Sequence, residues 1–134
     1  MKRLMNISLL LVLVSLSPVS AMAGSIEGVD AFLQQLKGVS SFDAARNKDF
    51  WMKQYPADGK PRSCSTCHGD NLSKNGKHAK TGKTIDPMAV SVNPERYTKV
   101  KKIKKWFKRN CKWTLGRECT AQEQGDVIQY LRSL

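Results

Sequence analysis

The apolar positions of this chain recur mostly at steps of three and four residues, the spacing of one face of an α-helix. Residues 26–36 follow this spacing, and Gly38 marks the end of the segment. A second segment, residues 43–54, begins at Asp43, a residue type that typically caps a helix N-terminus. The pattern therefore predicts two helices, followed by a loop over residues 55–61 that contains two prolines and a glycine.

Two further helices are predicted in the second half of the chain. Asn, Pro and Glu at residues 93–95 form a typical helix start, and a helix is expected over residues 98–110. The last helix begins at Thr120, where Thr120 and Glu123 match the capping box. No convincing strand is found, including in the polar stretch 69–82. The stripe of the third helix ends in an amide: Val100, Ile103, Trp106, Phe107 and Asn110.

Residues 64–68 read Cys-Ser-Thr-Cys-His, the C-x-x-C-H pattern at which c-type haem is attached. Two thiols at this spacing can form thioether bonds to the two vinyl groups of one haem. We therefore expect Cys64 and Cys67 to hold one haem c covalently and His68 to be the proximal iron ligand. The cysteine spacing matches zinc sites poorly, and a thioredoxin-like dithiol would need a βαβ pattern that the sequence lacks.

The imidazole of His68 needs a fixed orientation to serve as a ligand. A metal-bound histidine usually donates its second ring N–H to a carbonyl or carboxylate. We expect the Nδ1–H of His68 to donate to a backbone carbonyl of the Ile85–Met88 elbow, which Pro87 makes rigid.

A helix before the haem motif and a helix at the C-terminus indicate an all-α, class I cytochrome c-like fold around the haem. In that arrangement the helix before the motif crosses the C-terminal helix. We expect Phe50 and Trp51 to meet the last helix, and Gly125 to allow the two backbones to approach closely. The apolar stripe of the last helix consists of Val127, Tyr130, Leu131 and Leu134.

The N-terminus has the pattern of a secretory signal peptide. Two basic residues at positions 2–3 precede an apolar run over residues 7–19, and Ala-Met-Ala at residues 21–23 matches an A-x-A cleavage site. The run is short for a membrane span. We therefore expect residues 1–23 to be removed on export to the periplasm and residues 24–134 to form a single monohaem domain.

The chain has four cysteines, so haem attachment leaves Cys111 and Cys119 over. In an exported protein this pair is expected to form a disulfide. Closing so short a loop contributes about 2.5 kcal/mol in the chain-entropy model.

The residues alone leave the ligand on the other face of the iron open. Met88 would give the His/Met ligation of electron carriers, but it follows His68 closely, and a lone methionine is usually a core residue. His78 lies among lysines and is expected to be exposed. Asn110 extends an apolar stripe, so its amide needs a partner, and the iron is a candidate for that role. An open or water-filled site is the remaining alternative.

The segment R-N-C-K-W-T-L-G-R-E-C-T, residues 109–120, closely resembles a segment of the sphaeroides haem protein (SHP) family. These are small exported bacterial monohaem cytochromes c. The similarity extends to residues 63–69, 81–83 and 85–87, to Trp106 and to the final helix. It covers most of the chain after the first predicted helix, and the R-N-C-x4-G-R-[DE]-C-T run is its specific part.

The resemblance implies that Asn110 binds ferric iron through its side-chain oxygen and that Cys111 and Cys119 form a disulfide. It also implies that the asparagine leaves the iron on reduction, which opens a site for O2 or NO, and we expect CO to bind there as well. A hard, neutral amide oxygen favours Fe(III) over Fe(II), which fits this behaviour. Met88 stands where some members have another apolar residue, which favours a packing role. The family's redox partners include a dihaem cytochrome c and a membrane cytochrome b.

The formal net charge of +12 fits either a negatively charged partner or a plain solvated surface. Nine lysines and arginines lie between Arg96 and Lys112, with no acid among them. Nucleic acid would suit this charge, but the signal peptide argues against it. We expect an acidic redox partner, with anionic membrane headgroups as a second surface.

These features predict an exported electron-transfer and gas-binding cytochrome c rather than an enzyme. One alternative is a plain electron carrier with His68 and Met88 as ligands. The other is a haem reductase of a small oxygen or nitrogen oxidant, for which the sequence shows no distal acid–base pair.

Overall fold

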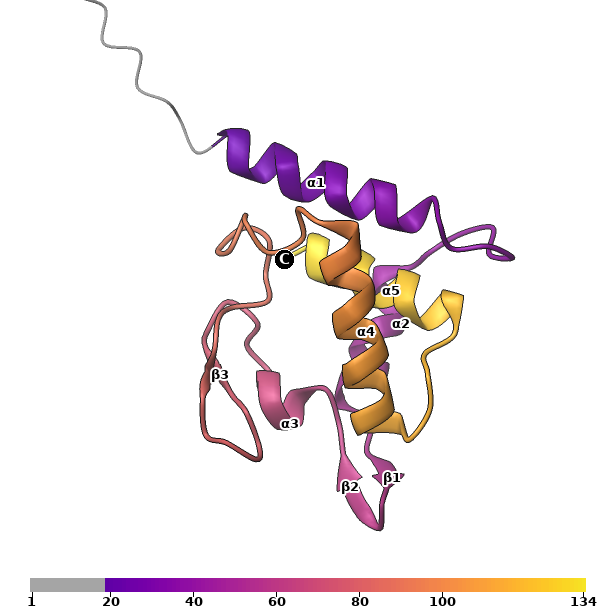
Figure 1. The fold of residues 1–134 in the computed structure, drawn as a ribbon, viewed down its shortest axis with the longest axis vertical. Helices are drawn as coiled ribbons and strands as arrows, with labels where there is room; N and C mark the ends of the chain where they lie inside the picture. The colour runs from indigo at the N-terminus through magenta and orange to yellow at the C-terminus, as the bar shows by residue number, and fades with distance from the viewer. Residues whose placement is uncertain (1–18) are drawn as a thin grey trace, which may run out of the picture.

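A computed structural model describes residues 19–134, and helices predominate in this part of the chain (Figure 1). The predicted signal peptide lies largely outside these residues, and its expected cleavage site falls within the first helix. Among residues 19–134 no helix is both long enough and apolar enough to cross a bilayer. The elements are α1 (Val19–Leu33), α2 (Ala44–Met52), β1 (Tyr55–Ala57), β2 (Lys60–Arg62), α3 (Ser65–His68), β3 (Gly76–Lys77), β4 (Thr84–Ile85), α4 (Val100–Leu115) and α5 (Ala121–Arg132).

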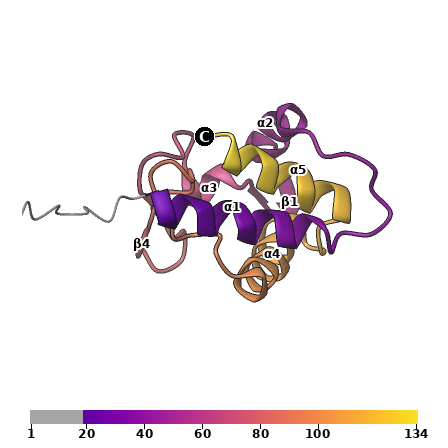
Figure 2. The same cartoon turned by 90° about the horizontal axis from the view of Figure 1, so that it is seen from above.

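Helices α2 and α5 pack against each other, as the sequence predicted, while α1 lies across α4 and α5 (Figures 1 and 2). Asp43 caps α2, because its side chain accepts a hydrogen bond from the N–H of Ala45 at 2.8 Å. Thr120 and Glu123 form the predicted capping box of α5. The helices of the predicted all-α fold, and the crossing of the helix before the motif with the C-terminal helix, are therefore confirmed in their main parts.

The hydrophobic core lies where α1, α2, α4 and α5 meet. Phe32 of α1 stacks on Phe107 of α4 with 5.4 Å between ring centroids. Leu134 is exposed, so the buried stripe of α5 ends earlier than predicted. The buried residues of the core are Val29, Phe32, Trp51, Leu72, Val90, Tyr97, Ile103, Val127, Ile128 and Leu131.

Gly125 and Gly28 each permit a close contact, and neither brings the backbones of α2 and α5 together as the sequence predicted. A Cβ added at Gly125 would lie 1.9 Å from the ring of Phe42, so this glycine admits a side chain rather than the backbone of α2. A Cβ at Gly28 would lie 2.0 Å from the carbonyl oxygen of Tyr97. The close backbone approach is therefore between α1 and the segment before α4.

Helix α4 begins later and ends later than predicted. Asn93 does not cap it; the N-cap is Lys99, and residues 94–97 form turns. The helix continues through Asn110 and ends at Gly116, whose left-handed backbone, with φ near +75°, stops it. Asn110 therefore lies inside the helix rather than at its end.

Two antiparallel hairpins occupy segments that were predicted to be loops. Tyr55 pairs with Arg62, and the turn at Asp58 and Gly59 has positive φ at both positions. An Asp-Gly pair is the strongest short hairpin signal, so this hairpin was predictable. Strands β3 and β4 form the second hairpin, with Gly76 opposite Ile85.

The carboxylate of Asp126 on α5 stabilises the packing of α5 against α2 by accepting four hydrogen bonds. It accepts the N–H of Asp43 at 2.7 Å, two N–H groups of Arg46 at 2.9 and 3.0 Å, and the amide of Gln122 at 2.9 Å. Burial opposes ionisation of this carboxyl, but the hydrogen bonds from Arg46, Asp43 and Gln122 outweigh it and hold the pKa of Asp126 below its ordinary value. The side chain is therefore charged in the folded protein at neutral pH.

Replacing Asp126 with asparagine should destabilise the protein at pH 7 by about 2 kcal/mol, because Arg46 and the N–H of Asp43 lose a charged acceptor. Because the folded-state pKa is depressed, the contribution is present above the unfolded-state pKa of about 4 and is lost as the pH falls through the folded-state value. Urea denaturation should therefore show the two proteins converging in acid.

Asp49→Asn is the matched control, since Asp49 is exposed on the same helix α2 and takes part in none of the ion pairs among the described residues. Its effect should stay within about 0.5 kcal/mol. Equal stability of Asp126→Asn and the wild type at pH 7 would contradict the proposed fastening.

Candidate functional site

Cys67 and His68 of the C-x-x-C-H motif lie on the single turn of α3, and Cys64 is its N-cap. Ser63, just before the turn, donates its N–H to the hydroxyl of Thr66 at 2.9 Å, and Thr66 donates its N–H back to the hydroxyl of Ser63 at 3.2 Å. This reciprocal pair closes the turn at its start. Cys64 and Cys67 are free, half-buried thiols three positions apart on it. Burial raises the pKa of Cys64 to about 12, so its thiol is protonated at neutral pH.

Glycines let the chain leave this turn and fold back over it. Gly69 follows His68 with φ near +71° and ends α3. A Cβ at Gly76 would lie 2.3 Å from the carbonyl oxygen of Cys67 and 2.9 Å from the Cα of His68. The β3–β4 hairpin therefore covers the backbone of the motif, and β3 lies beside α3 in Figure 1. Ala79, in the turn of this hairpin, donates its N–H to the sulfur of Cys67 at 3.4 Å.

Trp51 connects the motif to α2. Its ring lies 5.6 Å from the imidazole of His68, tilted by 45°, and its indole N–H donates to the carbonyl of Gly69 at 3.2 Å. The same ring lies 6.2 Å from that of Tyr130 on α5. Trp51 therefore lies against both His68 and Tyr130, and it connects the haem motif to the packing between α2 and α5.

The imidazole of His68 is in the form that binds a metal. Burial, and to a lesser degree the nearby charge of Arg96, lower the pKa of His68 to about 4, so the ring is neutral at neutral pH. Its Nδ1 is buried and has no hydrogen-bond partner among residues 19–134. The predicted bond to the Ile85–Met88 elbow is thus wrong for this structure. The elbow carbonyls accept from other side chains: Asp86 from Arg96, Pro87 from Asn93, and Met88 from Tyr97.

The donor set fits a covalently held haem. Two free thiols three residues apart suit two thioether bonds, and the neutral imidazole of His68 beside them suits axial ligation. Cys111 and Cys119 form a disulfide and are unavailable as zinc thiolates. Residues 19–134 contain no group of three or more His, Cys, Asp and Glu side chains arranged to hold a metal ion.

The three candidates for the opposite iron face lie on three different elements. Met88 is half-buried against the core, and its N–H donates to the carbonyl of Leu72 at 2.9 Å. His78 is exposed, as predicted, and its Nδ1 accepts the N–H of Thr81 at 3.2 Å in the β3–β4 turn. Asn110 is exposed on α4, and its side chain makes no hydrogen bond to another described residue.

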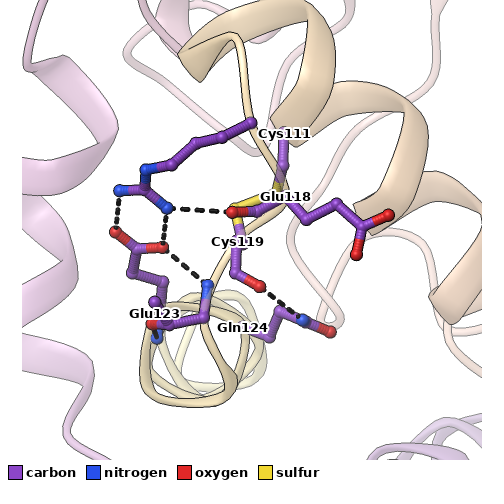
Figure 3. Close-up of a disulfide and its surroundings, with 7 residues drawn as sticks. Cys111, Glu118, Cys119, Glu123 and Gln124 are labelled. Atoms are coloured by element: carbon purple, nitrogen blue, oxygen red, sulfur yellow. Dashed lines mark hydrogen bonds and ion pairs between the residues drawn. A yellow bond between two sulfur atoms is a disulfide. The ribbon is translucent and has the colours of Figure 1, made fainter.

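The residue after Asn110 is held to the start of α5 by the Cys111–Cys119 disulfide, which the sequence predicted (Figure 3). Arg117 pairs with Glu123 at 2.7 and 2.8 Å, and Gln124 donates to the carbonyl of Cys119 at 2.9 Å. The connection between α4 and α5 is therefore fixed by the disulfide and, near Cys119, by an ion pair and a hydrogen bond.

Sequence analysis missed three residues that shape the motif. Ser63 and Thr66 have the spacing of a capping box, which was the available signal. Gly76 gave no distinct signal, because a glycine in a polar stretch is an ordinary loop residue. Their roles depend on the reciprocal hydrogen bonds and on a contact between the hairpin and the turn.

Trp51→Phe should keep the ring packing but leave the carbonyl of Gly69 without its donor, lowering the free energy of unfolding by about 1 kcal/mol. Trp106→Phe on the exposed face of α4 is the matched control and should change it by less than about 0.5 kcal/mol. Urea denaturation of both holoproteins makes the comparison. Equal values for the two variants would show that the indole N–H does not support the motif.

The chain is similar to known families and proteins over most of its length. The family described as "Domain of unknown function (DUF1924)" matches residues 37–131. The cytochrome c-type protein SHP of Cereibacter sphaeroides is 38% identical over 91 residues, which cover 66% of this chain and 69% of that protein. Cytochrome c'' of Methylophilus methylotrophus is 38% identical over 73 residues, covering 54% of this chain and 51% of that protein.

Two solved structures are also similar to this chain over most of its length. The structure of oxidised SHP, described as an oxygen-binding cytochrome c, matches with a TM-score of 0.66 and 31% identity, over 88% of this chain and 97% of that one. The crystal structure of oxidised cytochrome c'' matches with a TM-score of 0.63 and 27% identity, over 86% and 94%. The chain therefore belongs to the DUF1924 family of SHP-like c-type cytochromes.

Proposed function

We propose that this protein is an exported monohaem cytochrome c that exchanges single electrons and binds O2, NO or CO in its reduced state. The observation that carries the proposal is the C-x-x-C-H turn with a neutral, half-buried His68, on a chain similar to an oxygen-binding cytochrome c over 88% of its length. Cys64 and Cys67 hold the haem, and His68 is its proximal ligand. The haem supplies the one-electron couple of its iron and a site for diatomic gases.

Asn110 is the proposed sixth ligand of the oxidised protein. Its side-chain oxygen is a hard, neutral donor, which binds Fe(III) better than Fe(II). The amide is exposed and makes no hydrogen bond to another described residue, so it is not committed elsewhere in the fold. Asn110 would therefore hold ferric iron more firmly than ferrous iron, which would leave the ferrous iron accessible to a diatomic gas.

The surroundings of Asn110 indicate how it would leave. Helix α4 continues to Leu115, and the adjacent Cys111 is tied to Cys119. Because the backbone is helical on both sides of Asn110 and anchored directly after it, a rotation of the side chain is the simplest motion. Unwinding of the helix end is not required, and the same side chain can return on oxidation.

Met88 is the weaker candidate for this position. Its side chain packs against the core, its N–H is bonded to Leu72, and its carbonyl accepts the hydroxyl of Tyr97 at 2.8 Å. A residue held at both backbone groups and at the side chain fits a packing role. A plain His/Met electron carrier is therefore less well supported than a switching ligand.

Export is part of the same proposal. Residues 1–23 would direct the chain to the periplasm and be removed, leaving residues 24–134 as the haem domain. Ser25, Val29 and Phe32 of α1 are buried and lie after the cleavage site, so the mature chain would keep their contacts. The proposed redox partners are a dihaem cytochrome c or a membrane cytochrome b.

Asn110→Val should leave the ferric protein open to added anions, because valine has a similar size and no donor atom. Azide should bind ferric Asn110→Val at least about tenfold more tightly than the wild type, which corresponds to about 1.4 kcal/mol. Carbon monoxide should bind both reduced proteins equally well. Absorption spectra of the ferric and reduced holoproteins measure these changes.

Met88→Leu is the matched control, since leucine preserves the packing volume and removes the thioether. Its ferric spectrum should equal that of the wild type. A thioether that does not bind the iron gives no thioether-to-iron charge-transfer band, so the substitution removes none. If Asn110→Val left the ferric spectrum unchanged and Met88→Leu altered it, the ligand assignment would be reversed.

A further inference from the structure

Arg96, in the segment before α4, is a half-buried arginine that no acidic residue of the described chain neutralises. Four other arginines of residues 19–134 form ion pairs with a carboxylate: Arg46, Arg62, Arg117 and Arg132. The remaining one, Arg109, is exposed to solvent. Arg96 is therefore the arginine whose charge is partly withdrawn from water without an ion-pair partner among these residues.

The guanidinium of Arg96 is held by the backbone of the elbow over residues 85–88. Its Nη1 donates to the carbonyl of Asp86 at 3.1 Å, whereas the carboxylate of Asp86 forms no ion pair with it. A guanidinium has five N–H donors in a planar fork. The bond to Asp86 and the neighbouring hydroxyl of Tyr97 therefore leave donors for a further acceptor. A carboxylate fits the fork best, because it can accept two parallel hydrogen bonds.

A short series of contacts places this guanidinium beside the C-x-x-C-H turn. A Cβ at Gly76 of β3 would lie 2.9 Å from the Cα of His68, so the two backbones are in contact. Ile85 of β4 pairs with Gly76, and the next residue, Asp86, accepts the hydrogen bond from Arg96. The charge of Arg96 is also felt at His68, where it adds to the effect of burial in lowering the pKa of the imidazole.

The elbow that orients Arg96 is itself fixed by two neighbouring side chains. Asn93 donates its amide N–H to the carbonyl of Pro87 at 3.1 Å, and Tyr97 donates its hydroxyl to the carbonyl of Met88 at 2.8 Å. Three successive carbonyls of the elbow are thus bonded to side chains of one segment. The position of the guanidinium is therefore set by the polypeptide, and a preorganised donor loses less entropy when it binds.

A haem held by the neighbouring turn would bring the anion that this site lacks. Its ring is apolar, but it carries two propionate groups, which are carboxylates at neutral pH. A carboxylate withdrawn from water is unfavourable unless it is paired and hydrogen-bonded, and the same holds for a half-buried guanidinium. A bond between the two groups would satisfy both requirements.

We propose that Arg96 binds a propionate carboxylate of the haem, orients the haem and raises the reduction potential of its iron. The inference rests on the proposed function, because it assumes a haem attached at Cys64 and Cys67. Arg96 acts as a positioning residue through the propionate and does not touch the iron. An unneutralised carboxylate near the iron would favour Fe(III), which carries one more positive charge than Fe(II). Neutralising it therefore favours reduction.

The other free cations of the described chain fit this role less well. The lysines of α4 and of the β3–β4 hairpin are all exposed. An ammonium is a strongly hydrated point charge, and an ion pair at the surface is screened by solvent and contributes little. Arg109 is also exposed, and its guanidinium lies over the ring of Trp106 at 5.2 Å from the ring centre.

The test compares the holoproteins of the wild type and Arg96→Met, which keeps a long side chain but removes the charge and every donor. Spectroelectrochemical titration at pH 7 should show an equilibrium constant for reduction about tenfold lower in the variant, which is a potential about 59 mV lower. The resonance Raman band of propionate bending, which responds to hydrogen bonding of the carboxylate, should shift. The ferric absorption spectrum should remain that of the wild type, because the iron ligands are untouched.

Two matched controls separate the propionate bond from other effects. Asn93→Ala removes a side-chain bond to the same elbow, at Pro87, without changing the charge. Lys48→Met removes one positive charge at an exposed position on α2. Each should change the equilibrium constant less than about twofold and leave the propionate band in place. Arg96→Lys keeps the charge and should recover most of the potential, but it replaces the fork by one ammonium, so the band should still shift.

Equal potentials and propionate bands in Arg96→Met and the wild type would overturn the proposal. An equal change in Asn93→Ala would assign the effect to the elbow, and an equal change in Lys48→Met would assign it to net charge; either result would overturn the proposal as well. If Arg96→Met yields no folded holoprotein, the propionate band of Arg96→Lys decides: a shift supports the bond, and an unshifted band overturns it. A wild type that carries haem but binds no gas when reduced would refute the proposed function and leave the result for Arg96 standing.

Discussion

The contact between Trp51 and His68 is the point on which the rest of the structure depends. Through its ring, Trp51 belongs to the packing between α2 and α5; through its indole N–H, it holds the carbonyl directly after His68. The crossing of the two helices, fastened by Asp126, thereby determines where the imidazole lies. A binding turn of only four residues has too little buried surface to hold its own position, so the helices around it must do so.

The turn itself is shaped by local interactions and then covered. Ser63 and Thr66 close it by reciprocal hydrogen bonds, and the β3–β4 hairpin lies over it at Gly76. The polypeptide fold by itself therefore places two thiols and one imidazole close together. Such preorganisation limits the conformational entropy that is lost when a rigid group is bound.

Helix α4 combines a side that packs against the core, a strongly charged exposed surface and an anchored C-terminal end. Ile103 and Phe107 bury one side against the core, while lysines occupy the remaining surface and weaken the helix electrostatically. The disulfide at Cys111 and the left-handed Gly116 secure the end of the helix. The core contacts and this secured end offset the repulsion, so the helix can present a strongly charged face to solvent.

Patterns confined to a few neighbouring residues were predictable, because caps, the C-x-x-C-H motif and the short Cys111–Cys119 loop depend on local chemistry. Even so, the end of α4 was misplaced, since Asn110 and Gly116 are both plausible stop signals and only the backbone at Gly116 distinguishes them. The sequence by itself determined the helical class, the donor set and the excess of positive charge. The tertiary structure alone decided that Phe42 fills the space at Gly125, that Gly76 covers the motif and that Trp51 touches His68. These contacts join residues distant along the chain, and no local spacing encodes which distant surfaces will meet.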